Sequence, residues 1–456
     1  MVKIAQDLRN ALDLVAKLDP TNPPIISFRA NDICSMGIAR SASAVNRETI
    51  WLYYTWANAA SWFSEDSRHW NHHYRLRNPA ENPNETVRQL VTLGEALLST
   101  FGRPLLVLPS SDTVQTFLFQ NEATLSPYFN IYGDMNYRSF RSDITNKGIF
   151  FENLANSLHS VCPKTLYFTD QQSLQNAAHA AKYPSVLKPA IKDTGQTFYK
   201  FNKRRKAVLA NSPLELVQQA EKFIRMNLPM VVQELIDFDP PYGEVPFYCF
   251  FDRNHRLQFS AAGVKRVIQP ATYGTAIVLE LTQNKDLIKI SEKLGELLAW
   301  TGPLMIEFIH DRNDNSWKII EINTRPWLFH DFYRQNGFPF IGAVILDHED
   351  RFDPNGDLCS LLTQTKKPQN VPTTTEQKSR IHVDLPSFIK YLNAQSNDKK
   401  LTSSDVLSAL QNYDSVISYA HGNSDDPVPL ERAITEISDA YNLSSATLIK
   451  FAMSDI

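Results

Sequence analysis

Three polar side chains of different chemistry occupy alternate positions in the apolar segment at 317–327: Glu321, Asn323 and Arg325. In an extended strand, alternate side chains share one face and lie ~7 Å apart. Carboxylate and amide oxygens are ligands that hard divalent cations prefer, and a guanidinium binds oxyanions. The pattern is compatible with a site for a metal-bound polyphosphate, although three polar residues taken alone more often form a solvated strand face.

A second apolar segment, 304–310, carries a single acid, Glu307. The polar, turn-rich residues 311–316 separate the two segments, so we expect an antiparallel hairpin. If its turn is centred near Asp314, Glu307 faces Glu321, because each lies seven positions from that centre. Buried like charges at this distance are costly unless a cation neutralises them, and Mg²⁺ needs only one or two carboxylates besides phosphate oxygens. The hairpin therefore predicts a metal site with Asn323 beside the two carboxylates.

Length and composition indicate a globular protein with several domains. The chain has 456 residues, 43% of them hydrophobic and 21% charged, which suits about two to four domains. A net charge of −3 provides no basic field for nucleic acid as the main partner. No apolar run approaches the ~20 residues of a membrane span, and residues 1–18 lack the features of a signal peptide. The four unpatterned cysteines indicate neither a zinc site nor disulfides, so we expect a cytoplasmic protein.

The first third of the chain alternates between strand and helix patterns. Residues 1–22 have the periodicity of an amphipathic helix, and 36–41 and 86–101 also favour helices. Apolar segments at 25–28, 50–54 and 105–109 indicate strands, which together predict a parallel α/β domain. Ligands of such domains bind beyond the carboxyl ends of strands. Ser110, Ser111 and Asp112 are thus candidate substrate residues, although capping of a helix at 113–120 explains them more simply.

After residue 138 the expected elements carry isolated polar residues. We expect strands at 165–168, 185–189 and 230–236, helices at 149–160, 171–182, 214–225 and 286–301, and a hairpin of 247–251 with 256–261. Lys188 points inward from its strand, and residues 192–206 form a polar, basic loop. The tail contains a Pro/Thr/Gln-rich linker at 363–375 and helices at 388–392, 403–412 and 430–441.

Four motifs in this order resemble the ATP-grasp superfamily: Val-Leu-Lys-Pro at 186–189, Gln-Glu-Leu-Ile at 233–236, Ile-Glu-Phe at 306–308, and Ile-Glu-Ile-Asn-Thr-Arg at 320–325. The segments at 110–112, 37–41 and 425–429 are similar to those of the carboxylate–amine ligase branch that includes D-aspartate ligase. The likeness extends from about 25 to 435 and is strongest within the four motifs.

The resemblance implies an α/β and α+β multidomain fold, with a Rossmann-like N-terminal domain, an ATP-grasp fold and a small, mostly helical C-terminal region. The expected bounds are an N-terminal helix at 1–24, a pre-ATP-grasp α/β domain at 25–142, an ATP-grasp domain at 143–350, and a linker with helices at 351–456. Within the ATP-grasp domain, the nucleotide lid would span about 160–235 and the carboxylate-bearing half about 236–350.

The resemblance also implies roles for individual residues. Glu307, Glu321 and Asn323 match metal ligands, and Arg325 would stabilise the transferred phosphate or acyl phosphate. The remaining matches are Lys188 and, less securely, Lys147 with ATP phosphates, the adenine-reading hinge Gln233, Glu234, Leu235 and Ile236, and the basic pair Lys265 and Arg266 near the phosphoryl acceptor. A solvated charge pair explains Lys265 and Arg266 nearly as well. Ribose needs an acid after the hinge, and Asp237, Asp239 and Glu244 all qualify.

One departure from the family concerns the loop over the phosphates. ATP-grasp enzymes often use a glycine-rich loop there, whereas 192–206 contains only Gly195. Its positive charges are expected to attract phosphate instead: Lys192, Lys200, Lys203, Arg204, Arg205 and, at the end, Lys206.

The implied activity is that of an ADP-forming carboxylate–amine ligase working through an acyl phosphate. Such an enzyme needs ATP and Mg²⁺, with Mn²⁺ as an alternative ion, and acts on a small-molecule carboxylate and amine such as an amino acid or peptide. A D-aspartate-ligase-like or dipeptide-forming activity is the sharper expectation. Two alternatives stay open: a non-catalytic nucleotide-binding regulatory module, which the glycine-poor loop motivates, and a small-molecule kinase on the same scaffold.

Overall fold

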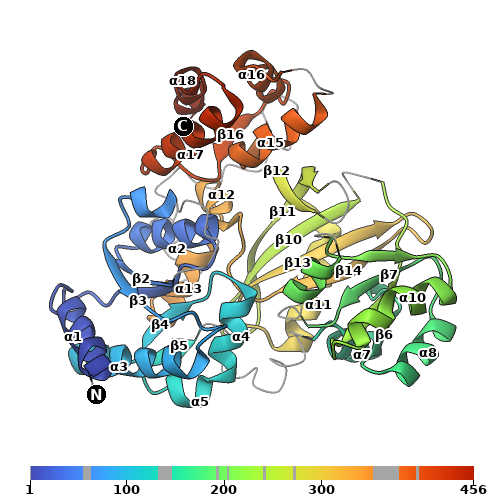
Figure 1. The fold of residues 1–456 in the computed structure, drawn as a ribbon, viewed down its shortest axis with the longest axis horizontal. Coiled ribbons are helices and arrows are strands. Elements are labelled where there is room, and N and C mark those ends of the chain that lie inside the picture. Colours follow the sequence, from blue (N-terminus) through green and yellow to red (C-terminus); the bar gives the residue numbers. More distant parts are fainter. Residues whose placement is uncertain are drawn as a thin grey trace. The chain divides into compact units, whose positions relative to one another are not determined.

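The computed structural model describes residues 2–54, 63–131, 146–191, 195–202, 205–239, 243–270, 274–352, 379–396 and 400–455 (Figure 1). The chain divides into two compact units, Met1–Gly133 with Arg325–Ile456, and Asp134–Thr324. The first unit is therefore discontinuous in sequence. This division assigns residues 325–350 to the first unit, whereas the sequence analysis grouped them with the ATP-grasp domain.

The first unit contains a five-stranded parallel sheet in the order β3-β2-β1-β4-β5. The strands are β1 (Ile25–Phe28), β2 (Thr49–Tyr53), β3 (His72–Arg75), β4 (Leu105–Leu108) and β5 (Phe129–Ile131). The predicted parallel α/β arrangement and the three apolar strands are confirmed. Both edge strands were missed, because β3 is polar and β5 has only three residues.

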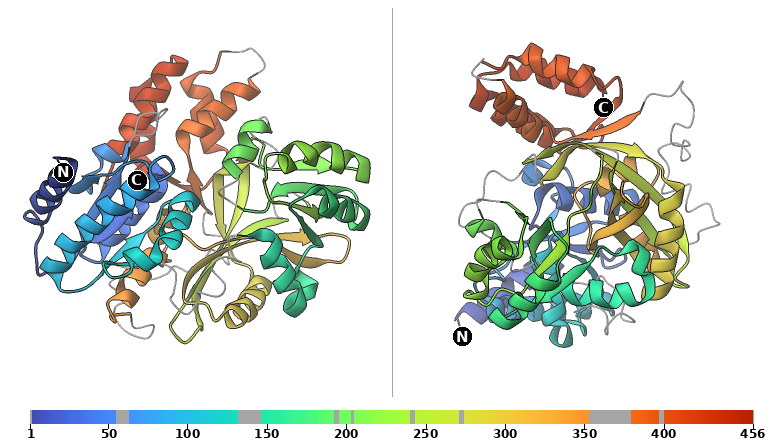
Figure 2. Two further views of the ribbon diagram at one scale, coloured as in Figure 1. Left: turned by 60° about the horizontal axis from the view of Figure 1, so that its bottom comes forward. Right: turned by 90° about the vertical axis from the view of Figure 1, so that its right-hand side faces the viewer.

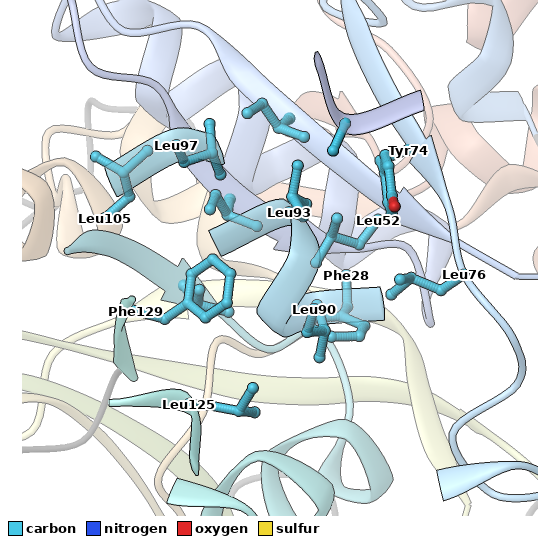
Figure 3. Packing of buried hydrophobic residues seen from close by; sticks show 14 of the residues in the cluster. Phe28, Leu52, Tyr74, Leu76, Leu90, Leu93, Leu97, Leu105, Leu125 and Phe129 are labelled. Atoms are coloured by element: carbon cyan, nitrogen blue, oxygen red, sulfur yellow. The ribbon is translucent and has the colours of Figure 1, made fainter. Parts of the chain in front are cut away.

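Helices of the first unit cover this sheet: α1 (Val2–Val15), α2 (Asp32–Ala44), α3 (Pro83–Phe101), α4 (Asp112–Gln120) and α5 (Glu122–Leu125), with the short η1 (Phe63–Asp66). Leu90, Leu93 and Leu97 lie on one face of α3 and pack into a core with Phe28 and Leu105 (Figure 3). Their three- and four-residue spacing is typical of the core-facing side of an amphipathic helix.

The C-terminal part of the first unit is helical but also contains two strands. It comprises α12 (His330–Gln335), α13 (Phe340–His348), β15 (Arg380–Val383), α15 (Leu385–Gln395), α16 (Ser403–Gln411), β16 (Val416–Tyr419), α17 (Val428–Tyr441) and α18 (Ser445–Asp455). β15 and β16 pair in parallel. Helices were predicted correctly near α15, α16 and α17, whereas α18 and both strands were missed. The expected linker at 363–375 lies outside the described residues.

Buried ion pairs join this tail to the N-terminal part of the same unit. The Arg40 guanidinium donates to Asp426 at 3.0 and 2.8 Å and to Asp331 at 3.3 Å. Arg47 binds Glu349 through two hydrogen bonds of 2.7 Å each. Each of these pairs links positions about 290 or more residues apart, so they depend on the folded unit.

The second unit begins with α7 (Lys147–Leu158) and η3 (His159–Val161), followed by an antiparallel sheet in the order β6-β9-β7-β8. Its strands are β6 (Thr165–Phe168), β7 (Ser185–Pro189), β8 (Val208–Ala210) and β9 (Met230–Glu234), and its helices are α8 (Gln171–Ala180) and α10 (Pro213–Ile224). Part of the expected basic loop is instead a short helix, α9 (Gly195–Phe201). Phe198 explains the difference, because it is buried and its ring centroid lies 4.6 Å from that of Phe223.

Five longer strands of the second unit form an antiparallel sheet in the order β14-β13-β10-β11-β12 (Figure 2). They are β10 (Glu244–Phe251), β11 (Leu257–Gln269), β12 (Thr275–Thr282), β13 (Gly302–Asp311) and β14 (Ser316–Asn323), with α11 (Lys285–Leu298) packed against one face. β12 was not predicted from the sequence. The core side of the sheet carries Phe247, Ile306 and Phe308, so the alternate residues point to the opposite face.

The predicted hairpin of β13 and β14 is confirmed, and Glu307 is the register partner of Glu321. The turn does lie near Asp314, but the register that it sets is one residue away from the expected one. Asp311 pairs with Ser316, which centres the turn before Asp314, and this register would place Ile320 opposite Glu307. A shift of one residue after Phe308, of the kind a β-bulge produces, brings Glu321 to Glu307 instead.

Two further findings concern the whole described chain. Cys34, Cys162 and Cys249 are free thiols. Among the described helices, none combines the length and hydropathy that a bilayer span requires.

Candidate functional site

A cluster of acidic and basic side chains lies on the polar face of the five-stranded sheet in the second unit. Glu307 and Glu321 face each other on adjacent strands. The Lys265 ammonium on β11 donates to Glu307 at 3.1 Å and also to Glu244. The Lys147 ammonium, from the first turn of α7, lies 3.4 Å from the Glu321 carboxylate. Acids and lysines expected to serve one site are therefore neighbours in the fold.

Lys265 stays charged in this surrounding. Burial disfavours its ammonium, but Glu307 and Glu244 outweigh that effect and raise the pKa of Lys265 above its ordinary value. Its side chain is only 10% exposed. An unpaired carboxylate at such a position would be costly, so the lysine stabilises both acids when no metal is bound.

The pKa of Lys188 is shifted in the opposite direction to that of Lys265. Lys188 projects from β7, and its ammonium donates to the Gln233 side-chain oxygen at 3.0 Å. Burial and the neighbouring charge of Lys147 lower the pKa of Lys188 to about 8, although Glu321, Glu307 and Glu244 act to raise it. Lys188 thus lies within electrostatic reach of the carboxylates and gives up its proton more easily than an ordinary lysine.

The residues expected to bind metal fit a hard cation that is completed by phosphate oxygens. Glu307 and Glu321 provide opposed carboxylates, and the buried Asn323 lies two positions further along β14. No group of three or more His, Cys, Asp or Glu side chains arranged for metal binding occurs among the residues that the structure describes. Two carboxylates and an amide are nevertheless the protein contribution that Mg²⁺ typically takes when a nucleotide supplies the remaining ligands.

The expected adenine hinge lies at the end of β9, where its first two side chains are already engaged. The Gln233 amide binds both Lys188 and Thr165. Glu234 accepts from the Lys164 backbone N–H at 3.0 Å and pairs with Lys182 at 3.3 Å. The next two positions differ in exposure, with Leu235 at 38% and Ile236 at 6%. Gln233 is therefore occupied within the sheet rather than turned outward as an adenine acceptor.

The three acids considered for ribose have different partners in the structure. Asp237 and Asp239 both bind Arg312, each at 2.6 Å, at an exposed position just after the hinge. Glu244 instead binds Lys265 inside the carboxylate cluster. Its position associates Glu244 with the charged site, and the ribose role stays a prediction for all three acids.

Lys206 and Arg266 do not join the cluster. The exposed Lys206 ammonium donates to the Thr275 hydroxyl at 2.9 Å. Arg266 lies at a register shift in β11 and forms an ion pair with Glu280 on β12. In the strand register, Glu280 lies opposite Val264. Val264 and Lys265 are consecutive in a strand, so their side chains point to opposite faces. Lys265 and Arg266 are thus not the adjacent basic pair that the sequence suggested.

Arg325 belongs to the first unit, where it has an acidic partner that the sequence analysis did not assign. Its guanidinium donates to the Asp112 carboxylate at 2.7 Å and to the Pro326 carbonyl at 2.9 Å. Asp112 is the first residue of α4, and the preceding Ser111 caps that helix by accepting from Val114. The capping explanation is confirmed for Ser111, while Asp112 orients Arg325.

Two contacts of the candidate site residues could not be predicted from the sequence. Thr165 meets Gln233 from a strand 68 residues away, and Asp112 meets Arg325 across 213 residues. The strand pattern at 165–168 was recognised, but strand pairing over such separations leaves no local signature in a single sequence.

Comparison with known proteins gives a fold and no close relative. Neither a protein-family model nor a curated protein matches the sequence. The biotin carboxylase domain of 2-oxoglutarate carboxylase from Hydrogenobacter thermophilus, solved with MgADP, ADP and bicarbonate, matches with a TM-score of 0.51 and 14% identity, over 72% of this chain and 70% of that chain. Biotin carboxylase from Campylobacter jejuni, in a β-γ-ATP complex, matches with a TM-score of 0.51 and 12% identity, over 71% and 70%.

A third match is pyruvate carboxylase from Rhizobium etli, with a TM-score of 0.51 and 15% identity, over 72% of this chain and 28% of that longer chain. At these identities the likeness concerns the fold alone. The mixed α/β multidomain architecture is thereby confirmed, whereas the ATP-grasp assignment and the reaction have to be argued from the residues.

Proposed function

We propose that this protein is an ATP-dependent, ADP-forming ligase that joins a small carboxylate to an amine through an acyl phosphate. The observation that carries the proposal is the pairing of Glu307 with Glu321 among three lysines, Lys147, Lys188 and Lys265. Phosphoryl transfer needs positioning and charge stabilisation more than covalent chemistry, and this cluster supplies both signs of charge in one place.

The chain's own residues would serve ATP in distinct ways. Lys188 and Lys147 would donate to phosphate oxygens, with Lys147 exchanging its present contact to Glu321 for a phosphate. Mg²⁺ held by Glu307, Glu321 and Asn323 would neutralise phosphate charge. Because Lys265 also binds Glu244, it keeps an acidic partner when Glu307 turns to the metal.

The proposed reaction has two steps. A substrate carboxylate oxygen attacks the γ-phosphorus of ATP, ADP leaves, and an acyl phosphate forms. The amine nitrogen then attacks the acyl carbon, inorganic phosphate leaves, and the nitrogen loses a proton. We assign Arg325 to the developing oxyanion charge, since a planar guanidinium binds such oxygens with two N–H groups. Asp112 would keep that guanidinium in one orientation.

A narrower proposal is that the carboxylate or the amine belongs to an amino acid, as in D-aspartate ligases and dipeptide-forming enzymes. It is supported by the segments at 37–41, 110–112 and 425–429. Some of their residues also stabilise the first unit: an added Cβ at Gly37 would meet the His330 ring at 2.5 Å, and Asp426 holds Arg40. We further propose ATP with Mg²⁺ or Mn²⁺ and a cytoplasmic location.

The decisive experiment incubates the protein with ATP, Mg²⁺ and pairs of amino acids, and follows phosphate release and product mass. We expect phosphate only when both a carboxylate and an amine are present, together with a product that has lost one water. Glu321→Ala should abolish this turnover, whereas Glu292→Ala, on the exposed side of α11, should leave it unchanged. Phosphate release that depends on no substrate pair would count against the ligase.

The same assay separates two alternative functions. A nucleotide-binding regulatory module would bind ATP without turnover, and the single glycine in 192–206 is the observation that favours it. A small-molecule kinase would yield a phosphorylated substrate and no free phosphate after the amine is added. The site itself favours transfer, because a purely binding protein has no need for two opposed carboxylates beside three lysines.

A further inference from the structure

A row of polar side chains crosses three strands of the four-stranded sheet in the second unit. Thr165 on β6 pairs directly with Gln233 on β9. Gln233 also pairs with Val186 on β7, and Lys188 follows two residues later on the same face. The opposite face carries the core, with Val232 among its residues. The row therefore lies on the polar face of a sheet whose other face packs against the hydrophobic core.

Hydrogen bonds run along this row in a single direction. The Lys188 ammonium donates to the Gln233 oxygen at 3.0 Å, and the Gln233 nitrogen donates to the Thr165 hydroxyl at 2.9 Å. The Thr165 hydroxyl donates in turn to the Pro163 carbonyl at 3.0 Å. An ammonium can only donate, and the single hydroxyl hydrogen is already used. Both neighbours therefore require the same orientation of the Gln233 amide.

In this orientation the Gln233 oxygen is directed at the Lys188 ammonium and the Gln233 nitrogen at Thr165. The residue is 4% exposed, and turning the amide would break the bonds at both of its ends. Buried amides that lose their partners are costly, so the observed arrangement is strongly preferred. Gln233 is thereby placed to act on Lys188.

We propose that Gln233, held by Thr165, is a positioning residue that directs the Lys188 ammonium toward the phosphates of a bound nucleotide. The inference rests on the proposed ATP-dependent function. A lysine side chain is long and flexible, and fixing one of its three N–H groups leaves the other two in defined directions. A neutral acceptor suits this role, because it orients the ammonium without cancelling the charge that phosphate needs.

The first test examines the hydrogen bonds without any nucleotide. Competitive acylation with acetic anhydride over a range of pH, followed by peptide mass spectrometry, gives a titration midpoint for Lys188, with the exposed Lys289 as internal reference. Loss of the acceptor in Gln233→Leu should lower the midpoint by about one pH unit, since the ammonium loses a stabilising bond. Thr165→Val should shift it in the same direction, and Thr165→Ser, which keeps the hydroxyl, should not.

The second test examines nucleotide binding. Gln233→Leu and Thr165→Val should weaken ATP binding about tenfold, while adenosine binding and the preference for ATP over GTP stay unchanged. In a Lys188→Met background, Thr165→Val should have no further effect, because a residue that acts through Lys188 has nothing left to position.

Each outcome decides the proposal. An unchanged Lys188 midpoint in both variants overturns it, and so does a shifted midpoint with undiminished ATP affinity. Loss of adenosine binding or of the ATP preference in Gln233→Leu would show that Gln233 reads the base instead. A wild-type protein that binds no ATP refutes the proposed function and the nucleotide part of this inference together, whereas the labelling result still reports on the hydrogen-bonded row.

Discussion

The unusual protonation of Lys188 predicts that ATP binding takes up a proton from solution. Burial and the neighbouring Lys147 lower the pKa of Lys188 to about 8, against the raising effect of Glu321, Glu307 and Glu244. Phosphate oxygens favour the ammonium form, so a nucleotide bound beside Lys188 raises its pKa again. Lys188 is partly deprotonated near pH 8 in the free protein and protonated in the complex. Binding of ATP should therefore take up protons from the solution.

The size of the effect depends on pH. With a pKa of about 8, the neutral fraction of Lys188 in the free protein is ~0.1 at pH 7, ~0.5 at pH 8 and ~0.9 at pH 9. Binding at pH 8 should therefore take up about half a proton, and ATP affinity should fall about tenfold between pH 7 and pH 9. The nucleotide phosphates contribute little, because their last ionisation lies near pH 6.

Isothermal titration calorimetry in two buffers of different ionisation enthalpy measures this uptake directly. Lys188→Arg is the matched control, since a guanidinium stays charged throughout the range and should abolish the uptake. Lys188→Met removes the charge and should weaken binding at every pH. The reasoning is refuted if the wild type takes up no proton at pH 8, or if the uptake survives in Lys188→Met.

Three further predictions concern the metal site, the buried ion pair and acid stability. Glu307→Gln and Glu321→Gln should each abolish the Mg²⁺-dependent part of ATP stabilisation in thermal melts, because each removes one of the two opposed carboxylates. Each variant is compared with itself with and without Mg²⁺, since the loss of the pairing with Lys265 or Lys147 changes the melting temperature of the free protein as well; a full Mg²⁺ response in both would contradict the assignment. Asp426→Asn should lower the stability of the first unit by about 3 kcal/mol or more in a denaturation experiment, because the buried Arg40 charge loses most of its compensation. Asp425→Asn, at the exposed neighbouring position, should change the stability little in the same experiment. Burial lowers the pKa of His330 and His382 to about 4, below the unfolded value of ~6.5, so the unfolded chain binds protons first and stability should fall between pH 6.5 and 4 by up to about 3 kcal/mol for each group. In His382→Leu the difference between the unfolding midpoints at pH 7 and pH 4.5 should become smaller, with the remainder due to His330, and an undiminished pH dependence would exclude His382 as a cause.

Much of the local structure could be predicted from the sequence, because it depends on neighbours along the chain. Apolar periodicity identified the central strands of the first unit and the long helix α3, whose leucines recur at three- and four-residue spacing. Two apolar runs around a polar turn identified the β13–β14 hairpin with its carboxylates. The edge strands β3 and β5 escaped notice, since a polar or three-residue strand has no distinctive pattern.

Glu307 and Glu321 mark the limit of such reasoning. Their pairing was expected from a turn centred near Asp314, but the actual turn, centred just before Asp314, would align Glu307 with Ile320. A register shift in the folded sheet restores the pairing. Alternation along a strand is a property of the sequence, whereas a bulge arises from how two strands pack within a whole sheet.

The charges around the carboxylates depend on tertiary structure for the same reason. The motifs identified Lys188, Gln233 and Arg325 as residues of interest, and residue type alone indicated what each could bind. Only the fold showed that Gln233 is occupied by Thr165 and Lys188, that Arg266 turns away from Lys265, and that Asp112 holds Arg325. The sequence determines the chemistry of each side chain. The pKa of a lysine and the partner of an amide, however, depend on groups that come close only when strands distant in the chain lie side by side.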